Sequence, residues 1–90
     1  MKSKKYFTYI VRCADGTLYT GITTDIGRRM DEHNGLDKNK KGAKYTRVRR
    51  PVELVYKKSF FNRSEASKEE SRIKQLTRQQ KEKLLDKLRN

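Results

Sequence analysis

Apolar side chains along the chain fall into three strand-like runs separated by amphipathic and polar segments. The runs are 6–13 (YFTYIVRC), 17–23 (TLYTGIT) and 52–61 (VELVYKKSFF), and they are rich in aromatic and β-branched residues. Such runs, bounded by turn-forming residues, are typical of strands. The sequence therefore predicts three strands, the first two of which are close enough in the chain to form a hairpin.

The register of this hairpin depends on the length of its loop. A two-residue turn at Asp15-Gly16 would place Tyr9 and Tyr19 on opposite faces, because side chains alternate along a strand. A three-residue loop pairs Tyr9 with Gly21 and brings both tyrosines and Gly21 to one face. We favour the longer loop, since it places a glycine at the position that needs a left-handed backbone.

A helix is predicted between the second and third strands. Thr24 or Asp25 suits its N-cap, and the helix is expected to run to about Asn34, with Gly35 as a left-handed stop. Apolar side chains one turn apart form its buried stripe: Ile26 and Met30. The polar segment 35–51 then reads as a loop.

Two further helices follow the third strand. Ser64 is expected to cap the first of them, and a capping box at Thr77–Gln80 starts the second. Their apolar stripes are Ala66, Ile73 and Leu76 in the first helix, and Leu84, Leu85 and Leu88 in the second. The predicted fold is therefore α/β (α+β), with a three-stranded, mainly antiparallel sheet flanked by helices in the order β-β-α-β-α-α. We expect one domain over residues 1–90, with 1–5 as a loose tail.

The charge balance indicates a polyanionic partner. Lysine and arginine total 24 against 11 acidic residues, which gives a formal net charge of +13. Residues 38–50 contain seven bases and no acid. Nucleic acid is the usual partner of so basic a domain. No apolar run approaches the ~20 residues that span a bilayer, and no signal-peptide pattern opens the chain. We therefore expect a cytoplasmic protein without membrane association.

Cysteine chemistry contributes little to the interpretation. Cys13 is the only cysteine, which excludes an internal disulfide and argues against a cysteine-based zinc site. We read it as a small buried hydrophobe.

Several polar residues admit both a chemical and a structural interpretation. Arg29 and His33 are four apart and share a helix face; an arginine there suits a phosphate, and a histidine with pKa near 6.5 suits proton transfer. Each is equally consistent with an ordinary surface position. Tyr9 and Tyr19 suit a core, although nearby cations would lower a tyrosine pKa and favour a phenolate.

These residues in this order resemble the GIY-YIG nuclease superfamily. The matching stretches are TYIV, LYTGIT, RRMDEHN and SEASKEESRIK, and the resemblance covers roughly residues 6–76, closest to the small stand-alone bacterial members. Two motifs depart from the family pattern: Phe7-Thr8-Tyr9 replaces Gly-Ile-Tyr, and Tyr19-Thr20-Gly21 replaces Tyr-Ile-Gly. Both tyrosines and the second glycine are retained.

The resemblance implies a metal-dependent endonuclease. It implies catalytic roles for six residues: Tyr9, Tyr19, Gly21, Arg29, His33 and Glu70. One tyrosine would position or deprotonate a water molecule and the other would orient it. Glu70 would hold a single Mg²⁺ or Mn²⁺ ion, with Glu69 as the rival ligand because the helix register is open.

Nucleic-acid contacts are expected mainly from the basic loop. The residues concerned are Arg28, Lys40, Lys41, Lys44, Tyr45, Thr46, Arg47, Arg49 and Arg50, and DNA is favoured over RNA. No base-reading module accompanies the domain, so a separate targeting protein is a possible partner. The alternative function is a non-catalytic nucleic-acid-binding protein on the same fold, and a subunit that docks an acidic protein is a more distant one.

Overall fold

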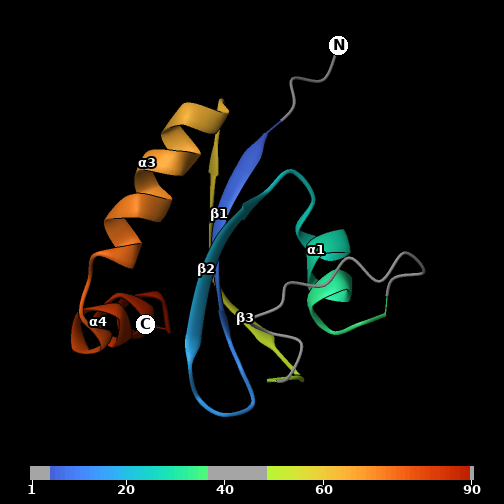
Figure 1. Cartoon of the computed structure of the whole chain (residues 1–90). Coiled ribbons are helices and arrows are strands. Elements are labelled where there is room, and N and C mark those ends of the chain that lie inside the picture. Colours follow the sequence, from blue (N-terminus) through green and yellow to red (C-terminus); the bar gives the residue numbers. More distant parts are fainter. Residues whose placement is uncertain (1–4, 37–48, 90) are drawn as a thin grey trace.

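Three strands form one antiparallel sheet in the computed structural model, which describes residues 5–36 and 49–89 (Figure 1). The strand order is β2-β1-β3. The bounds are Tyr6–Arg12 for β1, Leu18–Thr23 for β2 and Glu53–Phe60 for β3. Each predicted strand is present to within one residue at each end, and β1 lies in the centre because it pairs with both neighbours.

The hairpin has the register expected of a three-residue loop. Tyr9 pairs with Gly21 and Val11 pairs with Tyr19. Gly16 has φ of +85°, the left-handed conformation that glycine adopts without a steric penalty. Asp15 accepts hydrogen bonds from the backbone and hydroxyl of Thr17, which closes the turn.

Helices cover both faces of the sheet. Their bounds are Ile26–His33 for α1, Arg63–Lys74 for α3 and Arg78–Arg89 for α4. In Figure 1, α1 lies on one side of the sheet, and α3 and α4 lie on the other. The described elements thus follow the predicted order β-β-α-β-α-α in an α+β fold. None of the helices within the described residues is long and apolar enough to cross a membrane.

Alternation along β1 divides the core into two clusters. Tyr9, Val11 and Cys13 face α1, where Ile26 and Met30 pack against them. Ile10, on the opposite face, packs with a second set from the other strands and helices: Tyr56, Ile73 and Leu85. Cys13 is buried and free, as expected of a small core hydrophobe.

The helix caps correct one sequence prediction and confirm two others. Asp25 caps α1, and its carboxylate accepts the Arg28 N–H at 3.0 Å. Asn62, not Ser64, caps α3, because its side-chain oxygen accepts the Glu65 N–H at 2.9 Å. Asparagine and serine are about equally good N-cap residues. Asn62 takes the role because the helix already begins at Arg63, one residue before Ser64. The Thr77–Gln80 capping box is present in both directions.

The predicted 35–51 loop is described at its ends. Gly35 has φ of +75°, which confirms the left-handed stop after α1. Residues 37–48 lie outside the described part of the chain, as do residues 1–4 of the predicted tail.

Candidate active site

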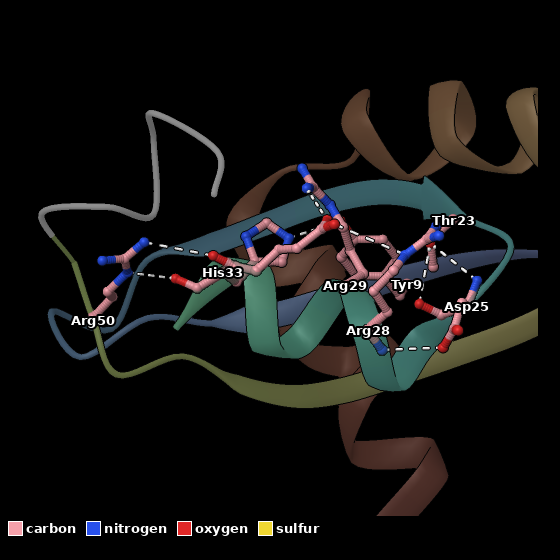
Figure 2. A network of polar contacts seen from close by, with 8 residues as sticks. Tyr9, Thr23, Asp25, Arg28, Arg29, His33 and Arg50 are labelled. Atoms are coloured by element: carbon pink, nitrogen blue, oxygen red, sulfur yellow. Dashed lines mark hydrogen bonds and ion pairs between the residues drawn. The ribbon is translucent and has the colours of Figure 1, made fainter. Parts of the chain in front are cut away.

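Tyr9 lies at the centre of a polar cluster between β1 and α1 (Figure 2). Its hydroxyl oxygen is 2.8 Å from His33 Nε2. Arg29 Nε donates to the same oxygen at 3.3 Å. Five of the six predicted catalytic residues meet here, and we call them the Tyr9 cluster: Tyr9, Tyr19, Gly21, Arg29 and His33.

Both tyrosines contact the histidine ring. The Tyr19 and His33 ring centroids are 5.4 Å apart, and those of Tyr9 and His33 are 5.7 Å apart. Both contacts are edge-on, with interplanar angles of 68° and 67°, the arrangement that the ring quadrupoles favour. The hairpin register places the two tyrosines on the face of the sheet toward α1, where both rings reach His33.

Gly21 leaves the space that the Tyr9 ring occupies. A Cβ atom at position 21 would lie 2.6 Å from Tyr9 Oη and 2.8 Å from Cζ. Strand pairing is regular at this position, so the glycine does not mark a bulge. The space beside Gly21 is therefore filled by the tyrosine opposite.

Glu32 fixes the direction of Arg29. Arg29 Nη1 donates to Glu32 Oε1 at 2.6 Å, and Arg28 Nε lies 3.8 Å from the other carboxylate oxygen. Glu32 is nearly buried, whereas Arg29 retains 22% of its side-chain exposure. A charge-assisted bond to a buried carboxylate is among the stronger polar contacts in proteins, so the guanidinium is preorganised at the surface.

The C-terminal end of α1 is tied to the start of β3. Arg50 Nε donates to the His33 carbonyl oxygen at 2.6 Å, as Figure 2 shows. Asn34 pairs with the backbone of Val52 in both directions, accepting its N–H at 2.8 Å and donating to its carbonyl at 3.3 Å. These contacts hold the helix turn that carries His33.

The two buried polar side chains have pKa values that differ from the sequence-based expectations. The pKa of His33 is lowered to about 4, chiefly by burial and in addition by the positive charges of Arg29 and Arg50, against the opposing effect of Glu32. Burial also raises the pKa of Tyr9, and this outweighs the lowering by Arg29. The expected pKa near 6.5 is therefore too high for His33, and in the metal-free protein burial outweighs the neighbouring cations at Tyr9.

Burial separates the cluster into an inner and an outer part. Tyr9 and His33 are 1% and 0% exposed, whereas Tyr19 and Arg29 are partly exposed. Beside Arg29 lies a surface pocket of about 300 Å³, which we call the arginine pocket. Its lining residues are Tyr6, Ile22, Thr23, Thr24, Arg28, Arg29, Glu32 and Arg63. Three arginines and one glutamate, Glu32, are thus among the residues that line this pocket.

The two candidate metal ligands on α3, Glu69 and Glu70, flank the buried stripe of the helix on opposite sides. Ala66 and Ile73 form this stripe, since both are fully buried. Glu69 accepts the Tyr56 hydroxyl of β3 at 2.8 Å and pairs with Arg72. Successive helical residues are about 100° apart, so Glu70 lies on the other flank, toward β2, where it pairs with Lys74 at 3.3 Å.

The carboxylates of the described residues suit a hydrated cation better than a closed metal site. No group of three His, Cys, Asp or Glu side chains with metal-binding geometry occurs in residues 5–36 and 49–89. Mg²⁺ commonly keeps several waters and takes one or two carboxylates. The half-buried Glu70 carboxylate fits this donor chemistry, whereas Glu69 is already engaged by Tyr56 and Arg72.

The predicted nucleic-acid contacts are only partly described. Arg28 is exposed beside the arginine pocket. Arg49 pairs with Asp15 at 3.1 Å, and Arg50 is engaged at α1. Six further residues lie outside the described part of the chain: Lys40, Lys41, Lys44, Tyr45, Thr46 and Arg47.

Sequence reasoning missed residues that support or extend the cluster. Glu32 is three residues after Arg29 and four after Arg28, a spacing that predicts ion pairs on a helix. Tyr6 and Arg63 belong to the arginine pocket but come from β1 and α3. No local pattern connects these two residues, because only the fold brings them together.

Comparison with known proteins identifies the class of protein that this fold and cluster define. The family model for the GIY-YIG catalytic domain matches residues 5–83. The chain therefore belongs to the GIY-YIG family, and this confirms the resemblance drawn from the sequence.

Similar proteins are small members of this family that carry the name UPF0213. One from Desulfotalea psychrophila is 64% identical over 72 residues, which cover 80% of this chain and 63% of that protein. One from Staphylococcus epidermidis is 54% identical and is covered over 94% of its length, against 90% of this chain.

A solution structure supports the fold independently. The protein EF2693 from E. faecalis is 44% identical, with a TM-score of 0.63 over 96% of this chain and 88% of that one.

Proposed function

We propose that the chain is a metal-dependent endonuclease that hydrolyses phosphodiester bonds in nucleic acid, with DNA as the expected substrate. The observation that carries this proposal is the setting of Arg29. Its guanidinium is held by Glu32 and Tyr9, is partly exposed, and lines a pocket with Arg28 and Arg63. Family membership supplies the reaction class, and the arginine pocket supplies a place for the phosphate.

Arg29 is proposed to bind the phosphate and to stabilise the charge that develops on it. Phosphoryl chemistry depends mainly on positioning and on charge stabilisation by preorganised groups. A guanidinium that is already fixed by Glu32 need not reorganise when the substrate binds. Arg28 and Arg63 add positive charge to the same pocket.

Tyr19 is proposed as the tyrosine that meets the attacking water. It lies on the edge strand β2 and is partly exposed, whereas Tyr9 is buried. A group that transfers or orients a proton must come within hydrogen-bond reach of the reacting water. Burial therefore favours Tyr19 for this role.

Tyr9 and His33 are proposed as positioning residues. Their pair joins three elements of the site, because Tyr9 also accepts from Arg29 and His33 packs against Tyr19. If His33 Nε2 accepts the proton of the Tyr9 hydroxyl, the phenol oxygen remains free to accept from Arg29. In this arrangement a neutral His33 is required.

Glu70 is proposed to hold the Mg²⁺ or Mn²⁺ ion. Its carboxylate lies on the β2 flank of α3, the flank that also carries Arg63. When bound, the ion would supply positive charge against the charge of the transition state. Glu69 keeps a structural role through Tyr56 and Arg72.

Metal-dependent nicking of supercoiled and branched DNA tests this proposal. The wild type is expected to cleave with Mg²⁺ or Mn²⁺, and Glu70→Gln is expected to abolish cleavage with its folding intact. Glu65→Gln is the matched control, since Glu65 is an exposed carboxylate in the first turn of the same helix. Equal activity of both variants would contradict the assignment of Glu70.

The alternative function gives a different outcome in the same assay. A non-catalytic binder would hold these substrates without cleaving them, and Glu70→Gln would leave its affinity unchanged. That result, obtained with RNA as well as DNA, would replace the endonuclease proposal.

A further inference from the structure

An exposed aromatic residue lies at the end of β3. Phe61 is 84% exposed in the turn that leads from β3 into α3. The neighbouring Phe60 is half-buried and pairs with Tyr6 across the β1–β3 ladder. A single exposed apolar residue needs no explanation, but here three aromatic residues gather at one end of the sheet.

Three basic residues lie near these aromatic residues in space or in the chain. Lys58 Nζ lies 5.6 Å from the centroid of the Phe60 ring, within cation–π range. Lys5 lines a small pocket with Phe60 and Phe61, and Arg63 follows Phe61 by two residues. The acid nearest in the chain is Glu65. We call this group the Phe61 patch: Lys5, Tyr6, Lys58, Phe60, Phe61 and Arg63.

Two residues of the Phe61 patch also line the arginine pocket. Tyr6 and Arg63 line that pocket together with Arg28 and Arg29. The same two residues adjoin Phe61, Tyr6 through its strand partner Phe60 and Arg63 through the chain. A strand with a phosphate at Arg29 would pass Tyr6 and Arg63 on its way to Phe61.

The combination of aromatic rings and cations points to an unpaired nucleobase. Proteins that bind single strands place aromatic side chains beside a positively charged groove. The apolar centres of protein interfaces, in contrast, are poor in lysine. The bases of a duplex are already stacked on one another. An exposed aromatic side chain therefore stacks more favourably on an unpaired base.

We propose that Phe61 stacks on an unpaired base of the nucleic acid while Arg63 and Lys58 contact the adjoining backbone. The placement of the strand rests on the proposed function, since it begins from a phosphate at Arg29. The stacking contact does not depend on cleavage. The substrate class inferred is nucleic acid with a single-stranded or branched segment.

Fluorescence tests the stacking contact directly. The chain contains no tryptophan, so the Phe61→Trp variant has a single reporter at this position. We expect its emission to be quenched by a single-stranded 12-mer in EDTA, and much less by the matching duplex. A blue shift that depends on protein concentration without nucleic acid would instead indicate self-association, and would overturn the proposal.

Affinity measurements complete the test. Base stacking on an aromatic ring predicts that Phe61→Ala weakens single-strand binding by about 5- to 100-fold, with duplex binding within about twofold of the wild type. Phe61→Leu is the matched control: it keeps an apolar side chain but should lose as much, while Phe61→Trp should retain affinity. Exposure of residue 61 makes all three variants compatible with the fold.

Other outcomes separate this proposal from the previous one. Unchanged single-strand affinity in Phe61→Ala, or no binding of either oligonucleotide, would overturn the stacking contact. If cleavage depends on Glu70 but Phe61→Ala binds single strands as the wild type does, the endonuclease proposal stands and the stacking proposal fails. Stacking without any cleavage would leave this inference standing and remove the nuclease.

Discussion

At the scale of single residues, burial decides the roles within the Tyr9 cluster. Tyr9 and Tyr19 are equivalent by residue type, yet one is enclosed by Gly21, Arg29 and His33 and the other remains partly exposed. Two predictions concern the enclosed part of the cluster.

Replacing Gly21 with alanine should destabilise the protein. The added Cβ would overlap the Tyr9 ring at 2.6 to 2.8 Å, and overpacking of this kind costs about 1–3 kcal/mol. Urea unfolding would show this as a lower midpoint. Gly27→Ala is the control: a Cβ there meets its nearest atom at 3.7 Å, so stability should be unchanged or slightly higher. Equal stability of the two variants would contradict the close packing at Gly21.

His33 should make stability dependent on pH between about 6.5 and 4. Its folded pKa of about 4 lies below the ordinary value of 6.5, so within this window the unfolded chain binds the additional proton. Stability is therefore lost as the pH falls through the window, by on the order of 3 kcal/mol in total. The carboxylates whose pKa values are lowered, such as Glu69, add their own loss below about pH 4.5.

NMR titration measures this directly, because His33 is the only histidine. We expect its ring signals to remain those of a neutral imidazole at pH 5, and unfolding midpoints to fall from pH 7 to pH 5. A titration midpoint near 6.5 would show that His33 is not held neutral.

At the scale of elements, the site depends on how α1 is attached to the sheet. Arg50 was predicted to contact nucleic acid, but its guanidinium donates to the His33 carbonyl at the end of α1. We expect Arg50→Gln to lower stability by about 1–3 kcal/mol, because a partly buried carbonyl loses a charged donor. Denaturant unfolding checks this; unchanged stability would contradict a structural role for the Arg50–His33 contact.

Local patterns predicted the elements well and the contacts between them poorly. The three-residue loop, the Gly35 stop and the capping box at Thr77 all depend on residues close in sequence, and all were confirmed. The prediction of Ser64 as the cap failed because Asn62, another good capping residue, lies two residues earlier. The Asn34–Val52 and Arg50–His33 contacts join residues that are 18 and 17 apart in the sequence, so no periodicity reveals them.

The same limit applies to the candidate site. The hairpin register placed Tyr9, Tyr19 and Gly21 on one face, and helix spacing placed Arg29 with His33. The resemblance to the GIY-YIG family joined these two sets, and the fold brings the five residues together. Spacing could not supply their pKa values, since desolvation by the core outweighs the neighbouring charges at Tyr9. Spacing also could not choose between Glu69 and Glu70 as the metal ligand. Which side of α3 faces β3 depends on tertiary packing, and the local sequence does not show it.

At the scale of the whole molecule, a net charge of +13 predicts strongly salt-dependent binding. If the protein neutralises about 5 phosphates of a DNA duplex, log affinity should fall against log salt concentration with a slope of about −4 to −5. Fluorescence anisotropy over a salt series measures the slope. An affinity that hardly changes with salt would contradict the polyanion interpretation.

The central claim is that Tyr19 and Arg29 form the reacting face of an endonuclease and that Tyr9 supports them from within. The most direct measurement is the rate of Mg²⁺-dependent nicking of supercoiled and branched DNA by the wild type, Tyr19→Phe and Tyr9→Phe. The account predicts cleavage by the wild type, a loss of about 10²–10⁴-fold in Tyr19→Phe, and a smaller loss in Tyr9→Phe together with lower stability. Binding without cleavage by the wild type, or full activity of Tyr19→Phe, would contradict it.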